Sequence, residues 1–169
     1  MMMTTFQIPS FSFDRKFLRE NSSKVISLLK PDDKIINIIA PRRSGKSTFI
    51  AYILADCLEY NIFERIICIS SNRNSFDQLL RLAHATFFDE VLEELTSTRD
   101  TISTDKSRII FTTMEVQNRF EGYKTDLIII DDCEHLSERA FCELYSCSIR
   151  SQGIITTSTI PLKYFKSSP

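Results

Sequence analysis

The chain has 169 residues, of which 43% are hydrophobic and 25% are charged, as in an ordinary globular protein. No run approaches the ~18 consecutive apolar residues of a membrane span, and the N-terminal segment MMMTTFQIPSFSFDRKF lacks the basic and apolar regions of a secretory signal. Membrane association and secretion are therefore not expected. Because 21 Lys and Arg residues balance 22 Asp and Glu residues, any contact with nucleic acid must be local or must arise from several assembled copies.

The pattern along the chain predicts one α/β domain. Residues 1–20 show no clean period and are expected to form a flexible or docking arm, and residues 21–169 are expected to form a single domain. Short isoleucine-rich runs, typical of strands buried on both faces, alternate with amphipathic segments. The predicted strands are 34–40, 65–71, 108–113, 126–132 and 153–159, and the predicted helices are 46–61, 75–96 and 136–150. This alternation predicts a three-layer α/β sandwich with a mostly parallel central sheet. The polar stretch 97–107 is expected to be a surface loop with room for a short strand.

The stretch IAPRRSGKST resembles a phosphate-binding loop that has lost its first glycine. Such a loop needs backbone N–H groups facing a phosphate, a helix behind them and a cation. Gly45 permits the close approach, Lys46 supplies the cation, and Ser47 can place a hydroxyl on Mg²⁺. Ala40 replaces the first glycine and fits if its φ angle is negative. The alternative is a surface turn followed by a helix that Ser44 or Ser47 caps.

The run DLIIIDDCEHL delivers two carboxylates to the C-terminal edge of the predicted sheet. Ligands of open α/β folds bind at this edge, where the phosphate loop also emerges. Asp131 can hold Mg²⁺, and Asp132 can orient or deprotonate an attacking water. The alternative is a solvated strand end. Glu134 and His135, in the turn that follows, carry no predicted role.

A zinc site is a competing interpretation of the same region, which contains Cys133, His135, Cys142 and Cys147. Their spacing does not match common structural zinc patterns, and the last two cysteines fit a half-buried helix. The five cysteines, an odd number, are expected to be free thiols.

Taken together, these motifs resemble the ATPase domain of the terminase large subunit, the DNA-packaging motor of herpesviruses and tailed phages. The segment APRRSGKSTF looks like the deviant phosphate loop of that family, and ERIICISSNRNSFDQLLRLAHATF is similar to its segment after the first helix. RFEGYKTDLIIIDDCEHL resembles the glycine-containing approach to the acidic strand, and GIITTSTIP looks like the Ser/Thr-rich coupling motif. The resemblance covers residues 30–165 and implies a P-loop NTPase fold of the ASCE (RecA-like) type.

The resemblance implies an ATP and Mg²⁺ site. Lys46 and Ser47 would bind phosphate and metal, and Arg42 would act on the γ-phosphate within the same chain. Asp131 would hold Mg²⁺, and Asp132 would replace the usual catalytic glutamate. The other residues implied to contact the ATP phosphates are Arg43, Ser44, Gly45 and Thr48.

The resemblance also implies a motor that translocates double-stranded DNA. Thr157, Ser158 and Thr159 would sense hydrolysis and couple it to the surface that grips DNA. The expected partners are double-stranded DNA and further copies in a homo-oligomeric ring, or a portal, a small terminase subunit and a nuclease chain. The expected location is intracellular, in the host nucleus for a herpes-like virus and otherwise in the cytoplasm.

Two other functions remain open at this stage. DDCEHL and TTST also resemble motifs of helicase-like ATPases, although those enzymes close two tandem domains around the nucleotide and this chain has room for one. The third hypothesis is a nucleotide-binding partner that does not hydrolyse ATP and regulates an active motor. The aspartate at position 132 favours this third reading, since it is one methylene shorter than glutamate.

Overall fold

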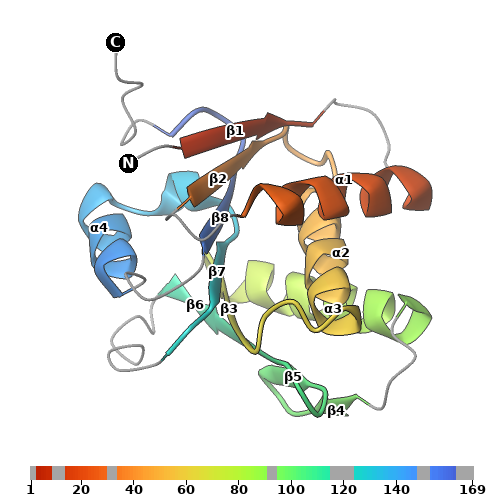
Figure 1. The fold of residues 1–169 in the computed structure, drawn as a ribbon. Helices are drawn as coiled ribbons and strands as arrows, with labels where there is room; N and C mark the ends of the chain where they lie inside the picture. The colour runs from red at the N-terminus through yellow and green to blue at the C-terminus, as the bar shows by residue number, and fades with distance from the viewer. Residues whose placement is uncertain are drawn as a thin grey trace.

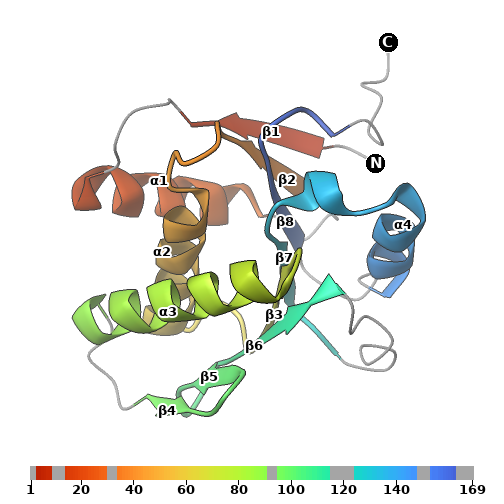
Figure 2. The same cartoon turned by 180° about the vertical axis from the view of Figure 1, so that it is seen from behind.

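The computed structural model describes residues 3–8, 14–29, 34–90, 95–114, 124–147 and 153–162. They form an eight-stranded sheet with helices on both faces (Figures 1 and 2). The strands are β1 (Met3–Gln7), β2 (Lys34–Ile39), β3 (Arg65–Ser70), β4 (Thr96–Ser97), β5 (Thr101–Ser103), β6 (Arg108–Thr113), β7 (Leu127–Ile130) and β8 (Gly153–Ser158). The helices are α1 (Arg15–Leu28), α2 (Lys46–Glu59), α3 (Arg73–Glu90) and α4 (Glu138–Cys147).

The sheet has the strand order β1-β2-β8-β7-β3-β6-β5-β4. The first six strands in this order, β1, β2, β8, β7, β3 and β6, pair in parallel. Strands β5 and β4 add an antiparallel hairpin at one edge. The mostly parallel sheet predicted from the isoleucine-rich runs is therefore confirmed. Strand β8, near the end of the chain, lies between the strand before the phosphate loop and the strand before the acidic pair.

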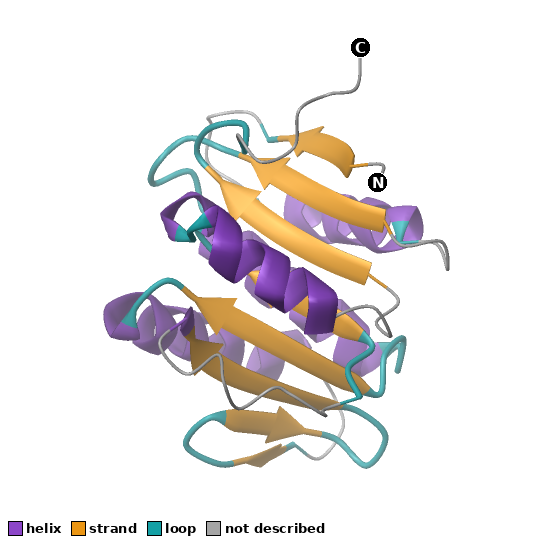
Figure 3. Ribbon diagram, turned by 90° about the vertical axis from the view of Figure 1, so that its left-hand side faces the viewer, coloured by secondary structure: helices purple, strands orange, loops and turns teal. Residues whose placement is uncertain are grey.

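Two apolar layers hold the helices to the sheet. Helices α1, α2 and α3 cover one face, and α4 covers the other (Figure 3). The larger layer packs α2 residues such as Phe49 and Leu54 against sheet residues such as Ile36. The smaller layer packs Phe141 and Leu144 of α4 against the other face of the same strands. The three-layer arrangement predicted from the sequence is confirmed.

The N-terminal segment differs from the expected arm. Residues 3–7 form the edge strand β1, which pairs in parallel with β2, and the Phe6 ring stacks on Phe49 of α2 with 6.4 Å between ring centroids. Helix α1 begins after Asp14, whose carboxylate accepts a hydrogen bond from Phe17 N at 2.7 Å. A five-residue strand is too short to show a clear period, so its place in the sheet was not visible in the sequence.

Other differences lie at element ends. The stretch 97–107, expected to be a surface loop with room for a short strand, contributes the short strand β5 and part of β4, because backbone pairing with β6 organises a polar sequence that has no apolar pattern of its own. Helix α3 begins two residues earlier than predicted and is described to Glu90. The end of the helix predicted over 75–96 is wrong, because Thr96 belongs to β4 and pairs with β5. The predicted helix segments 91–94 and 148–150 lie outside the described residues.

Candidate nucleotide-binding site

The loop between β2 and α2 has the backbone of a phosphate-binding loop. Arg43 and Gly45 have positive φ angles of 58° and 91°, and such alternating backbone conformations turn successive N–H groups toward one concave side. Helix α2 starts directly behind the loop, where Gly45 O accepts from Phe49 N at 2.8 Å. Ala40 is 1% exposed and is not among the described residues with positive φ. Its methyl group is therefore accommodated in place of the first glycine, as the sequence required.

Lys46 is held inside this loop. Its side chain is 8% exposed, and its Nζ donates to Ala40 O at 3.3 Å and to Pro41 O at 3.4 Å. The same ammonium lies 3.8 Å from Asp132 Oδ1. A buried ammonium needs partners of this kind, and here they hold the charge between the loop and the acidic strand end.

The predicted metal-binding pair is in direct contact. Asp131 is 1% exposed at the end of β7, and its Oδ2 accepts from Ser47 Oγ at 3.0 Å. Its Oδ1 accepts from Thr157 Oγ1 at 2.6 Å. A hydroxyl beside a carboxylate is a typical donor set for Mg²⁺, so these two side chains can hold that ion.

The fold changes the pKa of the Asp131 carboxyl group. Burial raises its pKa, and the neighbouring Asp132 raises it further. The hydrogen bonds from Thr157 and Ser47 and the charge of Lys46 oppose this rise. The net direction is upward, so the anion is less stable here than in water, and a bound cation would favour it.

We expect Asp131→Asn to change how stability depends on pH. Because the folded-state pKa of Asp131 is raised, its stabilising contribution is present below the ordinary value of 3.8 and is lost as pH rises through the folded-state value. The asparagine mimics the neutral form and has no such loss. In metal-free buffer, denaturation midpoints measured from about pH 4 to 8 should fall in the wild type relative to the variant. Parallel midpoints across this range would contradict the assignment.

Asp132 has an unusual backbone for a residue that is not glycine. Its φ and ψ angles are 53° and 52°, in the left-handed region that aspartate tolerates better than most residues. Its N–H donates to Thr157 Oγ1 at 2.9 Å, and its side chain is 30% exposed beside Lys46. Thr157 therefore contacts both acidic residues at once, donating to the first and accepting from the second.

The other residues of the predicted coupling motif, Ser158 and Thr159, have separate partners. Ser158 Oγ donates to Asn37 Oδ1 at 3.2 Å, and Thr156 Oγ1 donates to the same oxygen at 2.9 Å. These bonds join β8 to β2, the strand that leads into the phosphate loop. Thr159 donates to Glu134 Oε1 from its backbone at 3.2 Å and from its hydroxyl at 2.8 Å. The whole predicted coupling motif thus contacts the strands and the turn around the acidic pair.

A cleft of about 460 Å³ opens over the loop and the acidic turn, within the usual range for small-molecule sites. The predicted residues that line it are Arg42, Arg43, Gly45, Lys46, Ser47, Thr48, Asp132 and Thr159. The buried residues Asp131, Thr157 and Ser158 lie behind it. The structure therefore brings the predicted loop, acidic pair and coupling motif into one place.

Sequence reasoning gave no site role to several residues that line this cleft. Ser71, Asn72, Ser75 and Gln78 line it from the end of β3 and the start of α3. Glu134 and His135 line it from the turn after β7. The small polar residues where β3 ends were a usable signal, since all parallel strands end at the same edge. The direction of the Glu134 side chain was not predictable, because it depends on a short 3-10 turn.

Among the buried oxygen atoms that make no hydrogen bond in the described residues, two belong to this site: Ser44 Oγ in the loop and Glu134 Oε2 beside the cleft. Buried polar atoms normally have partners, so these two are consistent with a polar ligand at this place. The zinc alternative finds no support in the part of the chain that the structure describes, where no group of three or more His, Cys, Asp or Glu could hold a metal. Cys133 is buried and Cys142 is exposed.

The loop, the acidic strand end and a strand inserted between them define a P-loop NTPase of the ASCE (RecA-like) class. A family model narrows the class. The family of terminase large subunits, T4-like virus type, N-terminal region, matches residues 37–167, and the chain belongs to that family. No curated protein matches the chain at a significant level.

Solved structures agree with this fold. The SWI2/SNF2 ATPase core of Sulfolobus solfataricus, solved with double-stranded DNA, has a TM-score of 0.64 at 17% identity, over 87% of this chain and 32% of that chain. The N-terminal domain of the DNA-packaging ATPase of bacteriophage phi29 has a TM-score of 0.54 at 16% identity, over 82% of this chain and 78% of that chain. The large terminase ATPase domain of Thermus phage P74-26 has a TM-score of 0.53 at 12% identity, over 77% of this chain and 61% of that chain.

At such low sequence identity, these structural similarities establish a shared fold alone. The chain spans only 32% of the SNF2 core. Among the described residues, no helix has the length and apolar character needed to cross a membrane.

Proposed function

We propose that the chain is the ATPase domain of a viral DNA-packaging motor, which uses Mg-ATP hydrolysis to translocate double-stranded DNA inside the infected cell. One observation carries the proposal: a continuous series of hydrogen bonds that links Ser47 to Asp131, Asp131 to Thr157, and Thr157 to the backbone of Asp132. This series of hydrogen bonds connects the phosphate-binding loop, the acidic end of β7 and strand β8. Membership of the terminase family supports the choice of substrate.

The loop residues would hold the ATP phosphates. Arg43, Gly45, Lys46, Ser47 and Thr48 line the cleft at the start of α2, where the helix dipole favours an anion. The Lys46 ammonium would turn from the loop carbonyls to the β- and γ-phosphates, and the exposed Arg42 would reach the γ-phosphate. Ser47 and Asp131 would hold Mg²⁺, which neutralises charge on the phosphate oxygens when bound.

Asp132 would orient the attacking water and accept its proton. Its carboxylate lies at the cleft, 3.8 Å from the Lys46 ammonium. Hydrolysis of a phosphoanhydride depends mainly on positioning and electrostatic stabilisation, not on covalent chemistry by the protein. The cations and the fixed backbone of this site are suited to that task.

Thr157 would pass the state of the site to β8. When the charge or position of either aspartate changes, at least one of its two hydrogen bonds must change too. Ser158 and Thr159 extend this link to Asn37 in β2 and to Glu134 in the acidic turn. The assembled motor would be a homo-oligomeric ring or a complex with portal, small terminase and nuclease subunits, because a nearly neutral domain has little charge with which to hold a duplex alone.

The test is steady-state ATP hydrolysis with Mg²⁺, with and without double-stranded DNA, for the wild type, Thr157→Val and Thr157→Ser. The valine keeps the shape but leaves Asp132 N–H without its acceptor, a cost of about 1–3 kcal/mol in stability. We expect DNA to stimulate turnover in the wild type and in the serine variant. The valine variant should still bind ATP but lose the stimulation.

Other outcomes would select the competing functions. ATP binding without turnover in the wild type would leave a nucleotide-binding partner of an active motor. Turnover stimulated by single-stranded nucleic acid and not by the duplex would favour a helicase-like ATPase, to which the SNF2 fold similarity also points.

A further inference from the structure

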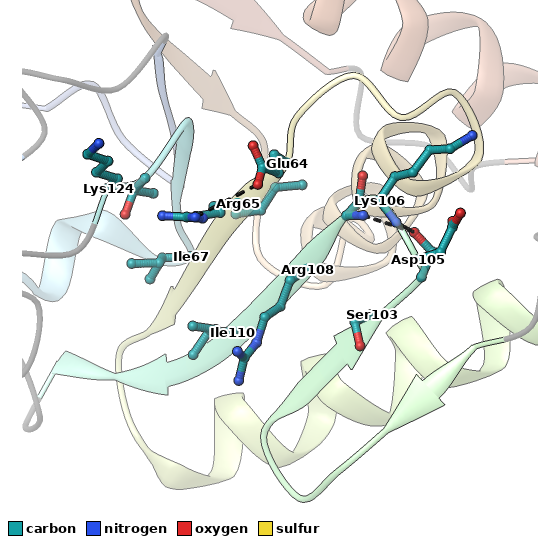
Figure 4. Close-up of a pocket in the computed structure, with 13 residues that line it drawn as sticks. Glu64, Arg65, Ile67, Ser103, Asp105, Lys106, Arg108, Ile110 and Lys124 are labelled. Atoms are coloured by element: carbon teal, nitrogen blue, oxygen red, sulfur yellow. Dashed lines mark hydrogen bonds and ion pairs between the residues drawn. The ribbon is translucent and has the colours of Figure 1, made fainter.

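A second concave surface lies at the opposite edge of the sheet, where the parallel strands begin. It encloses about 430 Å³ and is lined from β3, from β6, from the residues before β7, and from the end of β5 with the turn that joins it to β6. Arg65 and Ile67 of β3 and Arg108 and Ile110 of β6 lie on the same side of their strands, with Lys124 beside Arg65 (Figure 4). We call this surface the basic groove.

The register of β3 and β6 places two of these cations side by side. Arg65 and Arg108 are direct partners in the parallel ladder, and like charges in this position destabilise a sheet unless an anion lies near them. Glu64 Oε1 is 3.8 Å from Arg65, but both side chains are more than half exposed, so this pair contributes little. The nearby Asp126 carboxylate is already engaged, since it accepts from the backbone N–H groups of Glu64 and Arg65.

The other cations of the groove have no ion pair. In the part of the chain that the structure describes, the side chains of Lys106, Arg108 and Lys124 make no salt bridge. Three exposed cations of the helices differ, because Lys16, Arg73 and Arg139 each pair with an acidic residue one turn away. Its lining carries four cationic side chains against the two carboxylates of Glu64 and Asp105, so the groove is a local excess of positive charge on a chain whose net charge is -1.

We propose that the basic groove binds the phosphodiester backbone of double-stranded DNA. The inference rests on the proposed function, which supplies this polyanion as substrate. Arginine suits the role because its planar guanidinium can donate two hydrogen bonds to one phosphate. Ile67 and Ile110 give the groove an apolar floor that offers no hydrogen bonds to base edges, so binding should be independent of sequence.

The length of the cationic row favours a chain of phosphates over a single anion. The residues come from three neighbouring positions in the sheet, before β7, at the start of β3 and at the start of β6. Neighbouring strands are about 4.8 Å apart, so the row is about 10 Å long. One phosphate would occupy only part of it, whereas several successive phosphates of a duplex fall within this length.

The groove and the nucleotide cleft lie at the two ends of the same strands. Strand β7 runs from the side of Lys124 to Asp131, and β3 runs from Arg65 to Ser70, next to the cleft residue Ser71. DNA bound in the groove would therefore contact the strands that also position the acidic pair. This arrangement gives DNA a direct structural connection to the site of hydrolysis.

The experiment measures binding of a DNA duplex of mixed sequence at several salt concentrations. The variant is Arg65→Gln with Arg108→Gln, which keeps much of each side chain and removes two charges. The matched control is Lys16→Gln with Arg139→Gln, which removes two exposed, ion-paired charges from α1 and α4. Turnover of ATP without DNA is measured for all three proteins.

We expect the groove variant to lower DNA affinity tens-fold near 0.1 M salt and to reduce the slope of log K against log salt by about 1.8, since each phosphate contact contributes about 0.9. The control should bind like the wild type, and basal turnover should be unchanged in both. Equal affinity and slope in the groove variant and the wild type would overturn the proposal, as would an equal loss in the control.

These results separate the groove from the motor. If the wild type hydrolyses ATP and the groove variant binds DNA normally, the groove proposal fails and the motor stands. If no protein hydrolyses ATP but DNA binding still depends on Arg65 and Arg108, the groove stands and the proposed motor function fails.

Discussion

Lys46→Ala should lower ATP turnover at least ~100-fold, because removing one donor that stabilises transition-state charge typically has an effect of this size. The Lys46 ammonium is 3.8 Å from Asp132 and is held by two loop carbonyls, so it occupies the point where the phosphate loop meets the acidic turn. Its loss removes the cation for the phosphates and leaves the Asp132 carboxylate without the ion pair that it forms with Lys46. Nucleotide affinity should fall as well.

Steady-state turnover and calorimetric titration with ATP check this prediction, with Lys24→Ala on α1 as the control. Lys24 is an exposed lysine whose removal changes net charge by the same amount. Thermal melting shows whether each variant folds, and little loss is expected, since taking a mostly buried charge out of the loop removes a desolvation cost. Turnover within threefold of the wild type in a folded Lys46→Ala protein would exclude a phosphate-binding role for this loop.

The groove and the cleft together suggest how a nearly neutral domain can act on DNA. The charge of the whole chain is balanced, but its described cations without ion pairs include Arg42 and Arg43 at the cleft and Arg108 and Lys124 at the groove. On the helices, Lys16, Arg73 and Arg139 instead pair with an acidic residue one turn away. Local placement of charge, and not its total, therefore decides where phosphate is bound.

The strands and the loop of this fold could be predicted because their signals are local. The runs KIINII and LIII are continuous isoleucine-rich stretches, and both form strands buried in the sheet. The sequence SGKS places a glycine and a cation at the start of a helix, and Gly45 has the positive φ angle that the loop needs. In each case the physical cause lies within a few neighbouring residues.

The remaining features depend on contacts between distant residues. Strand β1 is ordered by pairing with β2 and by the stacking of Phe6 on Phe49, which the short sequence MTTFQ does not indicate. The hydrogen bonds from Thr156 and Ser158 to Asn37 join residues at opposite ends of the chain. The position of β8 between β2 and β7 follows from this packing, and no local pattern specifies it.

Asp132→Asn should lower the rate of hydrolysis by about 100- to 10,000-fold, the usual contribution of a positioned general base. Asparagine is nearly the same shape and also tolerates the left-handed backbone that this position adopts at φ 53°. The N–H bond to Thr157 should therefore persist. ATP affinity should stay equal or rise, because the phosphates no longer face the negative charge of this side chain.

Single-turnover hydrolysis with bound ATP separates this loss of chemistry from a loss of binding. Asp132→Glu is the matched variant, since it keeps the charge and extends it by one methylene toward the cleft. We expect it to retain hydrolysis, as the side chain at this position is 30% exposed and has room to adjust.

The nearest alternative base is Glu134, whose Oε1 is held by Thr159 and whose Oε2 makes no hydrogen bond in the described residues. Near-normal hydrolysis in Asp132→Asn that disappears in Glu134→Gln would move the role of general base to Glu134. In that case Asp132 would serve to hold Lys46 and the acidic turn in place, and the length of its side chain would not limit the rate.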